Sequence, residues 1–144
     1  FVHFNSRDNA RTPMQWDDTA NAGFTTGTPW LPVNENYHTI NAAAEAQDAD
    51  SVLSYYKQII RLRKTNPVLL SGIYEELLAD NEQIYAFSRT AGNRRIVTAV
   101  NFSAEEAQLP AGFLKGVRLI GSYADAPKNM LRPLEAVVYE EEIK

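Results

Sequence analysis

The chain has 144 residues, 44% of them hydrophobic and 22% charged, which is enough length and apolar content for a globular domain with a core. A net charge of −4 with scattered arginines argues against a nucleic-acid partner, because phosphates are neutralised by clustered Lys and Arg. The sequence has no cysteine and no apolar run long enough to cross a bilayer, which excludes disulfides, thiolate metal sites and a membrane-spanning helix.

The same composition sets expectations for location and bound groups. A chain without cysteine fits a reducing compartment, so we expect a cytoplasmic protein. His3 and His38 have no partners at metal-binding spacing, so we expect no metal site and no cofactor. The chain begins at Phe1 without an initiator methionine or a signal segment, as an excised fragment would.

Residues 6–40 show almost no apolar periodicity and are rich in turn-forming Asn, Thr, Gly, Asp and Pro, so we predict a long loop. Within it, Arg7–Asp18 gathers two arginines, three aspartates, an asparagine, a glutamine and a tryptophan. Paired planar donors and acceptors suit a ligand with adjacent hydroxyls, and a Trp ring can pack on the C–H face of a sugar. The arginines could equally pair with the loop's own aspartates while Trp16 enters a core, and the residues alone leave both interpretations open.

Two helices are predicted after this loop. Asn41 is a suitable cap for a short helix over 42–46, and Asp50 or Ser51 for a longer one over 52–64. The longer segment repeats apolar residues at helical spacing, as an amphipathic helix does. Asn66-Pro67 is expected to end it.

From Val68 onward the pattern changes to short β segments separated by turn residues. The predicted strands cover residues 72–78, 84–90, 95–102, 107–109, 117–123 and 136–141. This spacing is typical of an antiparallel β-sandwich. The tyrosines of this region could line a sugar-binding face, although tyrosine is also common in strands for packing alone; they are Tyr74, Tyr85, Tyr123 and Tyr139.

A family resemblance adds to this reading. Arg7–Trp16, followed by Asp17-Asp18, Ala22–Thr25 and Pro29-Trp30, resembles the late-barrel segment of α-glucosidases of the α-amylase clan, most similar to oligo-1,6-glucosidase and dextran glucosidase. Further matches run along nearly the whole chain: Asn36-Tyr37, Ile40-Asn41, Asp50-Ser51, Leu62–Lys64, Asn101-Phe102 and Leu131–Pro133.

The resemblance implies a mainly β fold and a domain order. Residues 1–65 would be the end of a catalytic (β/α)8 barrel, with an active-site loop at 6–40 and the final helix at 51–65. Residues 66–144 would form the C-terminal domain, an antiparallel Greek-key β-sandwich. The chain is then a fragment that packs on the rest of the barrel, and its uncovered apolar side chains would favour self-association.

The implied function is that of a retaining, exo-acting α-glucosidase that hydrolyses short α-1,6-linked glucosides, the isomalto-oligosaccharides. Arg7 would lie at the floor of the glucose pocket and hold the non-reducing end, with Arg11 as a second substrate-binding candidate. Asp8, Asn9 and Trp16 would shape the loop.

In this family the nucleophile and the acid precede the matched segment, so no catalytic residue is expected in this chain and the fragment alone should be inactive. The alternatives are a trehalose-6-phosphate hydrolase or a sucrose isomerase of the same clan, which share this loop, or a non-catalytic carbohydrate-binding module.

Overall fold

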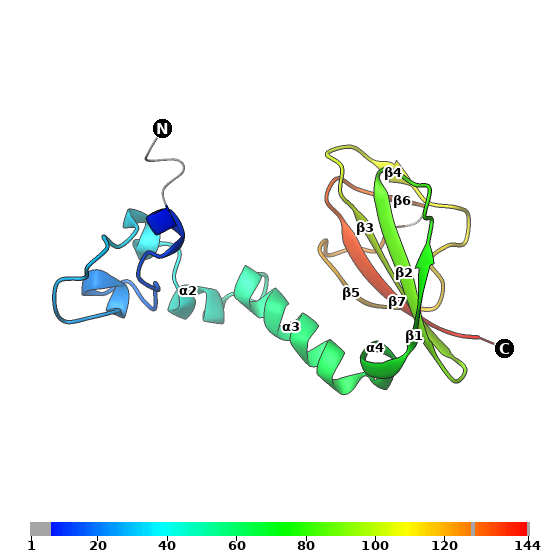
Figure 1. The fold of residues 1–144 in the computed structure, drawn as a ribbon, viewed down its shortest axis with the longest axis horizontal. Coiled ribbons are helices and arrows are strands. Elements are labelled where there is room, and N and C mark those ends of the chain that lie inside the picture. The colour runs from blue at the N-terminus through cyan, green and yellow to red at the C-terminus, as the bar shows by residue number, and fades with distance from the viewer. Residues whose placement is uncertain (1–6, 128, 144) are drawn as a thin grey trace. The chain divides into compact units, whose positions relative to one another are not determined.

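The structure, a computed structural model, describes residues 7–127 and 129–143 and divides into two compact units, Phe1–Ile60 and Arg61–Lys144 (Figure 1). The division between the units falls inside a helix. The domain boundary predicted between residues 65 and 66 is a separate matter and stays a prediction. Among the described residues, no helix has the length and apolarity that a bilayer crossing requires.

The first unit is built from short helices and loops. In chain order they are the 3-10 helices η1 (Arg7–Ala10), η2 (Ala20–Gly23) and η3 (Glu35–His38), then α2 (Ala42–Gln47) and the start of α3 (Val52–Thr65). The buried residues among those described in this unit are few: Pro13, Ala22, Asn41 and Ser51. The predicted loop therefore holds its shape mainly by hydrogen bonds and not by a hydrophobic core.

Both predicted helices of this unit are confirmed, with their caps. The side-chain oxygen of Asn41 accepts from the backbone N–H of Ala44 at 2.8 Å and starts α2. Ser51 takes the capping role at α3, where its hydroxyl oxygen accepts from the N–H of Ser54 at 3.1 Å. The carboxylate of Glu45 accepts from the N–H of Leu53 at 3.0 Å, which links the end of α2 to the first turn of α3.

A short helix follows α3 that the sequence pattern did not predict. Asn66-Pro67 ends α3 as expected, but the Asn66 side chain also accepts from the N–H of Val68 at 3.0 Å and starts α4 (Pro67–Ser71). Proline is well suited to the first helical position because its missing N–H has no partner there in any case. The strand predicted to follow begins only after Gly72.

The second unit is an antiparallel β-sandwich, which confirms the predicted fold class. Its larger sheet has the order β1-β2-β3-β7-β5, and β7 lies between β3 and β5, so the spatial order departs from the chain order as in a Greek key (Figure 1). The strands are β1 (Ile73–Leu77), β2 (Ile84–Ala91), β3 (Arg94–Asn101), β7 (Ala136–Glu142) and β5 (Val117–Gly121). The smaller sheet pairs β4 (Ala107–Gln108) with β6 (Met130–Leu131), and β6 was not predicted.

The hydrophobic core lies between the two sheets. Its buried residues are Ile84, Ala86, Ala99, Ala107, Leu109, Leu131, Val137 and Tyr139. They come from the inward-facing positions of β2, β3 and β7 and from the segments around β4 and β6.

A buried ion pair ties the segment before β7 to this core. Glu135 is fully buried, and its carboxylate accepts from the backbone N–H of Arg132 at 2.8 Å and from the Arg132 guanidinium at 2.7 and 3.0 Å. Burial opposes ionisation of Glu135, but the hydrogen bonds and charge of Arg132 outweigh it and lower the pKa of the carboxyl. Arg132 also donates to Asp125 at 2.7 Å and lies 4.0 Å from the ring centre of Tyr123.

Candidate functional site

The polar loop singled out from the sequence opens with η1. The side chains of Arg7 and Asn9 lie outside the part of the chain that the structure describes, so the roles predicted for them stay predictions. Asp8 is partly buried, and its backbone oxygen accepts from the N–H of Arg11 at 3.0 Å. The side chain of Arg11 is exposed.

Asp17 and Asp18 are not paired with Arg11: among the described side chains, no ion pair joins Arg11 to either aspartate. Asp17 instead accepts from the hydroxyl and the backbone N–H of Thr19, and these two hydrogen bonds lower the pKa of its carboxyl. Asp17 is thus held as an anion by Thr19 and not by Arg11.

A strained turn supports this part of the loop and was not predicted. Asn21, Ala22 and Gly23 all adopt the left-handed conformation, with φ of 55°, 57° and 64°. Ala22 is completely buried, and its oxygen accepts from the N–H groups of Trp16 at 2.9 Å and Asp17 at 3.3 Å. The only sequence signal for it is the presence of Asn and Gly, the residues that tolerate this conformation best.

The backbone of residues 15–17, which we name the strap, is held from its other side by α2. The oxygens of Gln15 and Trp16 accept from the N–H groups of Ala42 and Ala43, each at 2.9 Å. These are free donors at the first turn of a helix, so the strap satisfies them. The strap is therefore fixed between the left-handed turn and α2, and the Trp16 side chain projects from it with 53% of its surface exposed.

A cavity of about 340 Å³ lies beside the strap. Its walls include Met14, Gln15, Ile40, Asn41 and Glu45. Retaining glycoside hydrolysis needs two carboxyl groups about 5 Å apart, one as the nucleophile and one as the acid. Glu45 is the single carboxylate among the residues that line this cavity, and it accepts the hydrogen bond from Leu53, so this cavity does not hold such a pair.

The remaining candidates from the sequence separate in space. Tyr74 and Tyr85 come together, with their hydroxyl oxygens 3.1 Å apart, whereas Tyr139 is in the core and Tyr123 lies under Arg132. Hydrogen bonding between the two hydroxyls raises the pKa of Tyr74 to about 12. Within the described residues, no group of three or more His, Cys, Asp or Glu side chains could hold a metal ion.

The first half of the chain, which carries the polar loop, the strap and the helices that hold it, has a direct match among known families. The family described as "Alpha amylase, catalytic domain" matches residues 1–72. The chain belongs to the α-amylase family. The match includes η1 to η3, α2, α3 and α4, and it ends where β1 begins.

Relatives of this α-amylase-family chain share both its sequence and its fold. An oligo-1,6-glucosidase of Parageobacillus thermoglucosidasius is 45% identical over 96% of the chain, and a trehalose-6-phosphate hydrolase of Bacillus subtilis is 41% identical over 93%. The crystal structure of an isomaltulose synthase from Klebsiella sp. LX3 matches 94% of the chain with 44% identity and a TM-score of 0.82. The chain spans 26% of the length of each of these three proteins.

Proposed function

We propose that this chain is part of a retaining, exo-acting α-glucosidase that hydrolyses short α-1,6-linked glucosides. The observation that carries the proposal is the 45% identity to an oligo-1,6-glucosidase over nearly the whole chain. In this proposal the nucleophile and the general acid belong to the rest of the enzyme. The present chain supplies a wall of the glucose pocket and the C-terminal β-sandwich.

The contribution of the loop to the reaction is binding and orientation. Arg7 holds the terminal glucose at the floor of the pocket, because a guanidinium offers a rigid fork of donors to a sugar hydroxyl and to a neighbouring carboxylate at once. Arg11, which has no ion-pair partner among the described side chains, is the second candidate for a substrate contact. Asp8, Asn9 and Trp16 shape the loop, and Trp16 belongs to the strap, whose backbone is held on one side by Ala22 and on the other by α2.

A pocket closed at one end explains the proposed exo action. Only a terminal glucose can reach the floor, so one residue is released at a time, and fixing that residue orients the scissile bond relative to the catalytic carboxylates. A trehalose-6-phosphate hydrolase or a sucrose isomerase is the second candidate, supported by the similarity to a trehalose-6-phosphate hydrolase and to an isomaltulose synthase. A cytoplasmic location remains part of the proposal and is supported by the lack of cysteine.

The function is tested in a chimeric enzyme. This chain replaces the segment with which it aligns in the oligo-1,6-glucosidase of Parageobacillus thermoglucosidasius, and hydrolysis of isomaltose, trehalose 6-phosphate and sucrose is compared. We expect isomaltose to be the best substrate. In the chimera, Arg7→Ala should lower kcat/KM on isomaltose by about a hundredfold, because a charged hydrogen bond to substrate is worth roughly 1.5–3 kcal/mol.

A matched variant separates the pocket role from a general effect of removing charge. Arg61→Ala removes an exposed arginine of α3 and should leave kcat/KM near that of the unsubstituted chimera. If Arg7→Ala behaves like Arg61→Ala, the pocket role is wrong. The carbohydrate-binding-module alternative predicts measurable heat when isomaltotriose is titrated into the 144-residue chain, and the present proposal predicts none.

A further inference from the structure

The two sides of the polar loop are joined by the side chain of Gln15. The first side carries the arginines predicted to bind substrate, and the second side carries η3, where the ring centres of Tyr37 and His38 lie 3.9 Å apart. The side-chain amide of Gln15 donates to the side-chain oxygen of Asn36 at 3.0 Å and also to the backbone oxygen of Ile40. We name this pair of hydrogen bonds the latch. It connects the strap with residues that are 21 and 25 positions further along the chain.

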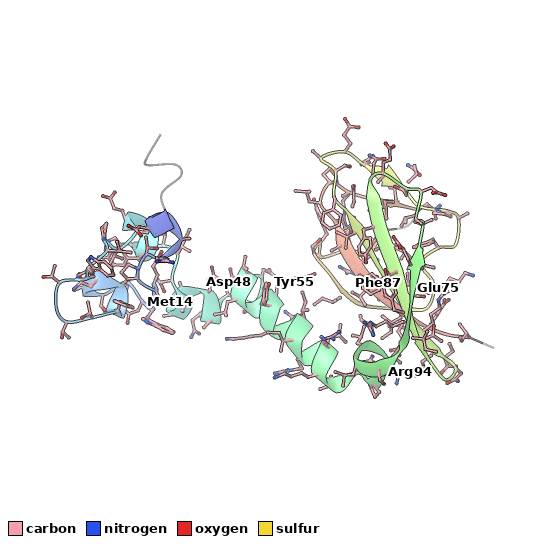
Figure 2. All side chains as sticks on the ribbon, viewed as in Figure 1. Met14, Asp48, Tyr55, Glu75, Phe87 and Arg94 are labelled. Atoms are coloured by element: carbon pink, nitrogen blue, oxygen red, sulfur yellow. The ribbon has the colours of Figure 1, made fainter. Side chains whose placement is uncertain are left out.

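The backbone beside the latch is fixed as well. The oxygen of Gln15 accepts from the N–H of Ala42 at 2.9 Å, at the start of α2. Asn41, which caps α2, also donates from its side chain to the oxygen of Tyr37 at 2.9 Å. Figure 2 labels Met14, the residue before Gln15, beside α2. The strap, η3 and α2 therefore form one hydrogen-bonded unit, to which Gln15 contributes both its side chain and its backbone.

The chemistry of an amide explains why a glutamine suits this position. A side-chain amide nitrogen carries two hydrogens, and the latch offers two accepting oxygens. Both donors of the Gln15 nitrogen are thus used inside the loop, so this group is not free to bind a sugar hydroxyl. Its contribution to a site in this loop is to hold other residues in place.

Few other interactions are available to do this work. Asn36 and Ile40 are exposed, Ile40 with 53% of its surface, and the buried residues among those described in this unit are few. Each intramolecular hydrogen bond favours the bonded arrangement by a factor of roughly 2 to 10, so two bonds together favour it by tenfold or more. The position of η3 relative to the strap should therefore depend on the latch.

We infer that Gln15 is a positioning residue for substrate binding, which keeps η3 attached to the strap so that both sides of the loop are in place before the substrate arrives. A site that is already formed binds its ligand without the entropic cost of ordering a loop. The inference rests on the proposed function, in which Arg7 and Arg11 on the first side of the loop hold the sugar. It adds the residue that fixes the second side of the loop relative to the first.

Gln15→Glu is the decisive substitution, because it changes the size of the side chain little and replaces the donating NH₂ by an acceptor. Asn36 could turn its own amide to meet the carboxylate, but the backbone oxygen of Ile40 cannot. If the attached arrangement falls to about a tenth of the molecules, the apparent affinity for substrate falls by the same factor. In the chimera, KM on isomaltose should rise about tenfold, while kcat should change less than twofold, because bound substrate selects the attached arrangement.

Matched variants separate the latch from general effects of substitution. Gln47→Glu makes the same change at an exposed position at the end of α2 and should leave KM within about twofold. Asn36→Asp keeps an accepting oxygen for the Gln15 amide and should also leave KM nearly unchanged, whereas Asn36→Leu removes that oxygen and should raise it. A role in stability alone would lower the melting temperature without this split between KM and kcat.

Hydrogen exchange of the 144-residue chain measures the latch without any activity. In Gln15→Glu, peptides that cover residues 36–43 should exchange about tenfold faster than in the wild type, because η3 separates from the strap more often. These peptides include the N–H groups of Ile40 and Ala42, which donate to Asn36 and Gln15. Peptides from β3 should exchange at the same rate in both proteins. If Gln15→Glu does not fold, Gln15→Met, which lacks the donors but is neutral, serves for both measurements.

The possible results have distinct meanings. Unchanged exchange at residues 36–43 would show that Gln15 does not hold η3 and would overturn the inference. Faster exchange with an unchanged KM would also overturn it, because η3 would then be held without any consequence for binding. An unsubstituted chimera that does not hydrolyse isomaltose contradicts the proposed function itself, whereas an active chimera in which Gln15→Glu behaves like Gln47→Glu contradicts only the positioning role.

Discussion

Replacing the Glu135 carboxylate by an amide should destabilise the sandwich far more than the exchange of one oxygen for an NH₂ group of nearly the same size suggests. In Glu135→Gln, one oxygen that accepts from Arg132 becomes an amide NH₂, which cannot accept and instead faces a donor. Glu135 is fully buried and accepts three hydrogen bonds from Arg132, so water cannot replace what is lost. Breaking a buried pair costs about 3–5 kcal/mol, whereas an exposed pair is worth about 0–1 kcal/mol.

We therefore expect Glu135→Gln to lower the free energy of unfolding of the second unit by about 3 kcal/mol. With a urea m-value of about 2 kcal/mol/M, the unfolding midpoint would move down by about 1.5 M. Both tryptophans, Trp16 and Trp30, belong to the first unit, so tryptophan fluorescence follows that unit, and the sheet is followed by the far-UV circular dichroism change that occurs without a change in fluorescence. The fluorescence transition should not move.

The control for this measurement is Glu106→Gln, which removes the same charge at an exposed position. It should shift the midpoint by no more than a surface charge does. A loss below about 1 kcal/mol for Glu135→Gln would refute the reasoning, because it would equate this buried pair with a surface pair.

The pH dependence gives a second check on the same residue. The pKa of Glu135 is lowered in the folded protein, so its stabilising contribution is complete above the unfolded value of about 4.3 and is lost as pH falls through the folded value. The wild-type chain should lose stability below about pH 4, and Glu135→Gln should lose less of its remaining stability there. Some acid dependence should persist, because Arg132 also lowers the pKa of Asp125.

Three further outcomes are expected. Gly23→Ala should destabilise the first unit by about 2 kcal/mol or more, because Gly23 has φ of 64° and a Cβ there would lie 2.7 Å from the Asp17 carboxylate oxygens. Adding Asp17→Ala should relieve part of this loss, as measured by unfolding followed with tryptophan fluorescence. Full additivity of the two substitutions would contradict the proposed clash. Asn41→Ala should cost about 1 kcal/mol by removing the α2 cap, with the exposed Asn34→Ala, which caps only the short η3, as the milder comparison. Tyr85→Phe should bring the pKa of Tyr74 down from about 12 toward its ordinary value in a spectrophotometric titration. The stabilisation linked to the raised pKa is complete below about pH 10 and is lost as pH rises toward 12, so the variant should also lose less stability at alkaline pH.

The elements that were predicted from sequence are those with a repeating local signal. The apolar run around Val97 and Ala99 marked β3, and the Asn41 and Ser51 caps marked α2 and α3. Helix α4 was missed because Asn66-Pro67 serves both as an end and as a start, and only the packing of Val68 decides between them. Strand β6 has two residues, too few for any alternation to appear.

The candidate site divides in the same way. The residue types of Arg7–Asp18 and their family resemblance pointed to sugar recognition, but the shape of the loop depends on contacts that no local pattern records. The strap is fixed by backbone bonds from Gln15 and Trp16 to Ala42 and Ala43, and backbone groups are the same for every sequence. The left-handed turn could not be inferred either, because alanine at its centre is an unfavourable residue for that conformation.

The hydrogen bonds at the two ends of residues 24–34 have a consequence for how the length of this loop can change in evolution or by design. The segment from Phe24 to Asn34 is held by hydrogen bonds at both ends. At its start the side-chain amide of Asn21 donates to the backbone oxygens of Thr25 and Gly27, and at its end Asn34 caps η3. Doubling the length of a flexible surface loop costs only about 0.6 kcal/mol in closure entropy. Insertions and deletions between residues 28 and 33 should thus be tolerated without moving Trp16, so this segment can change in length while the hydrogen-bonded backbone on either side of it stays in place.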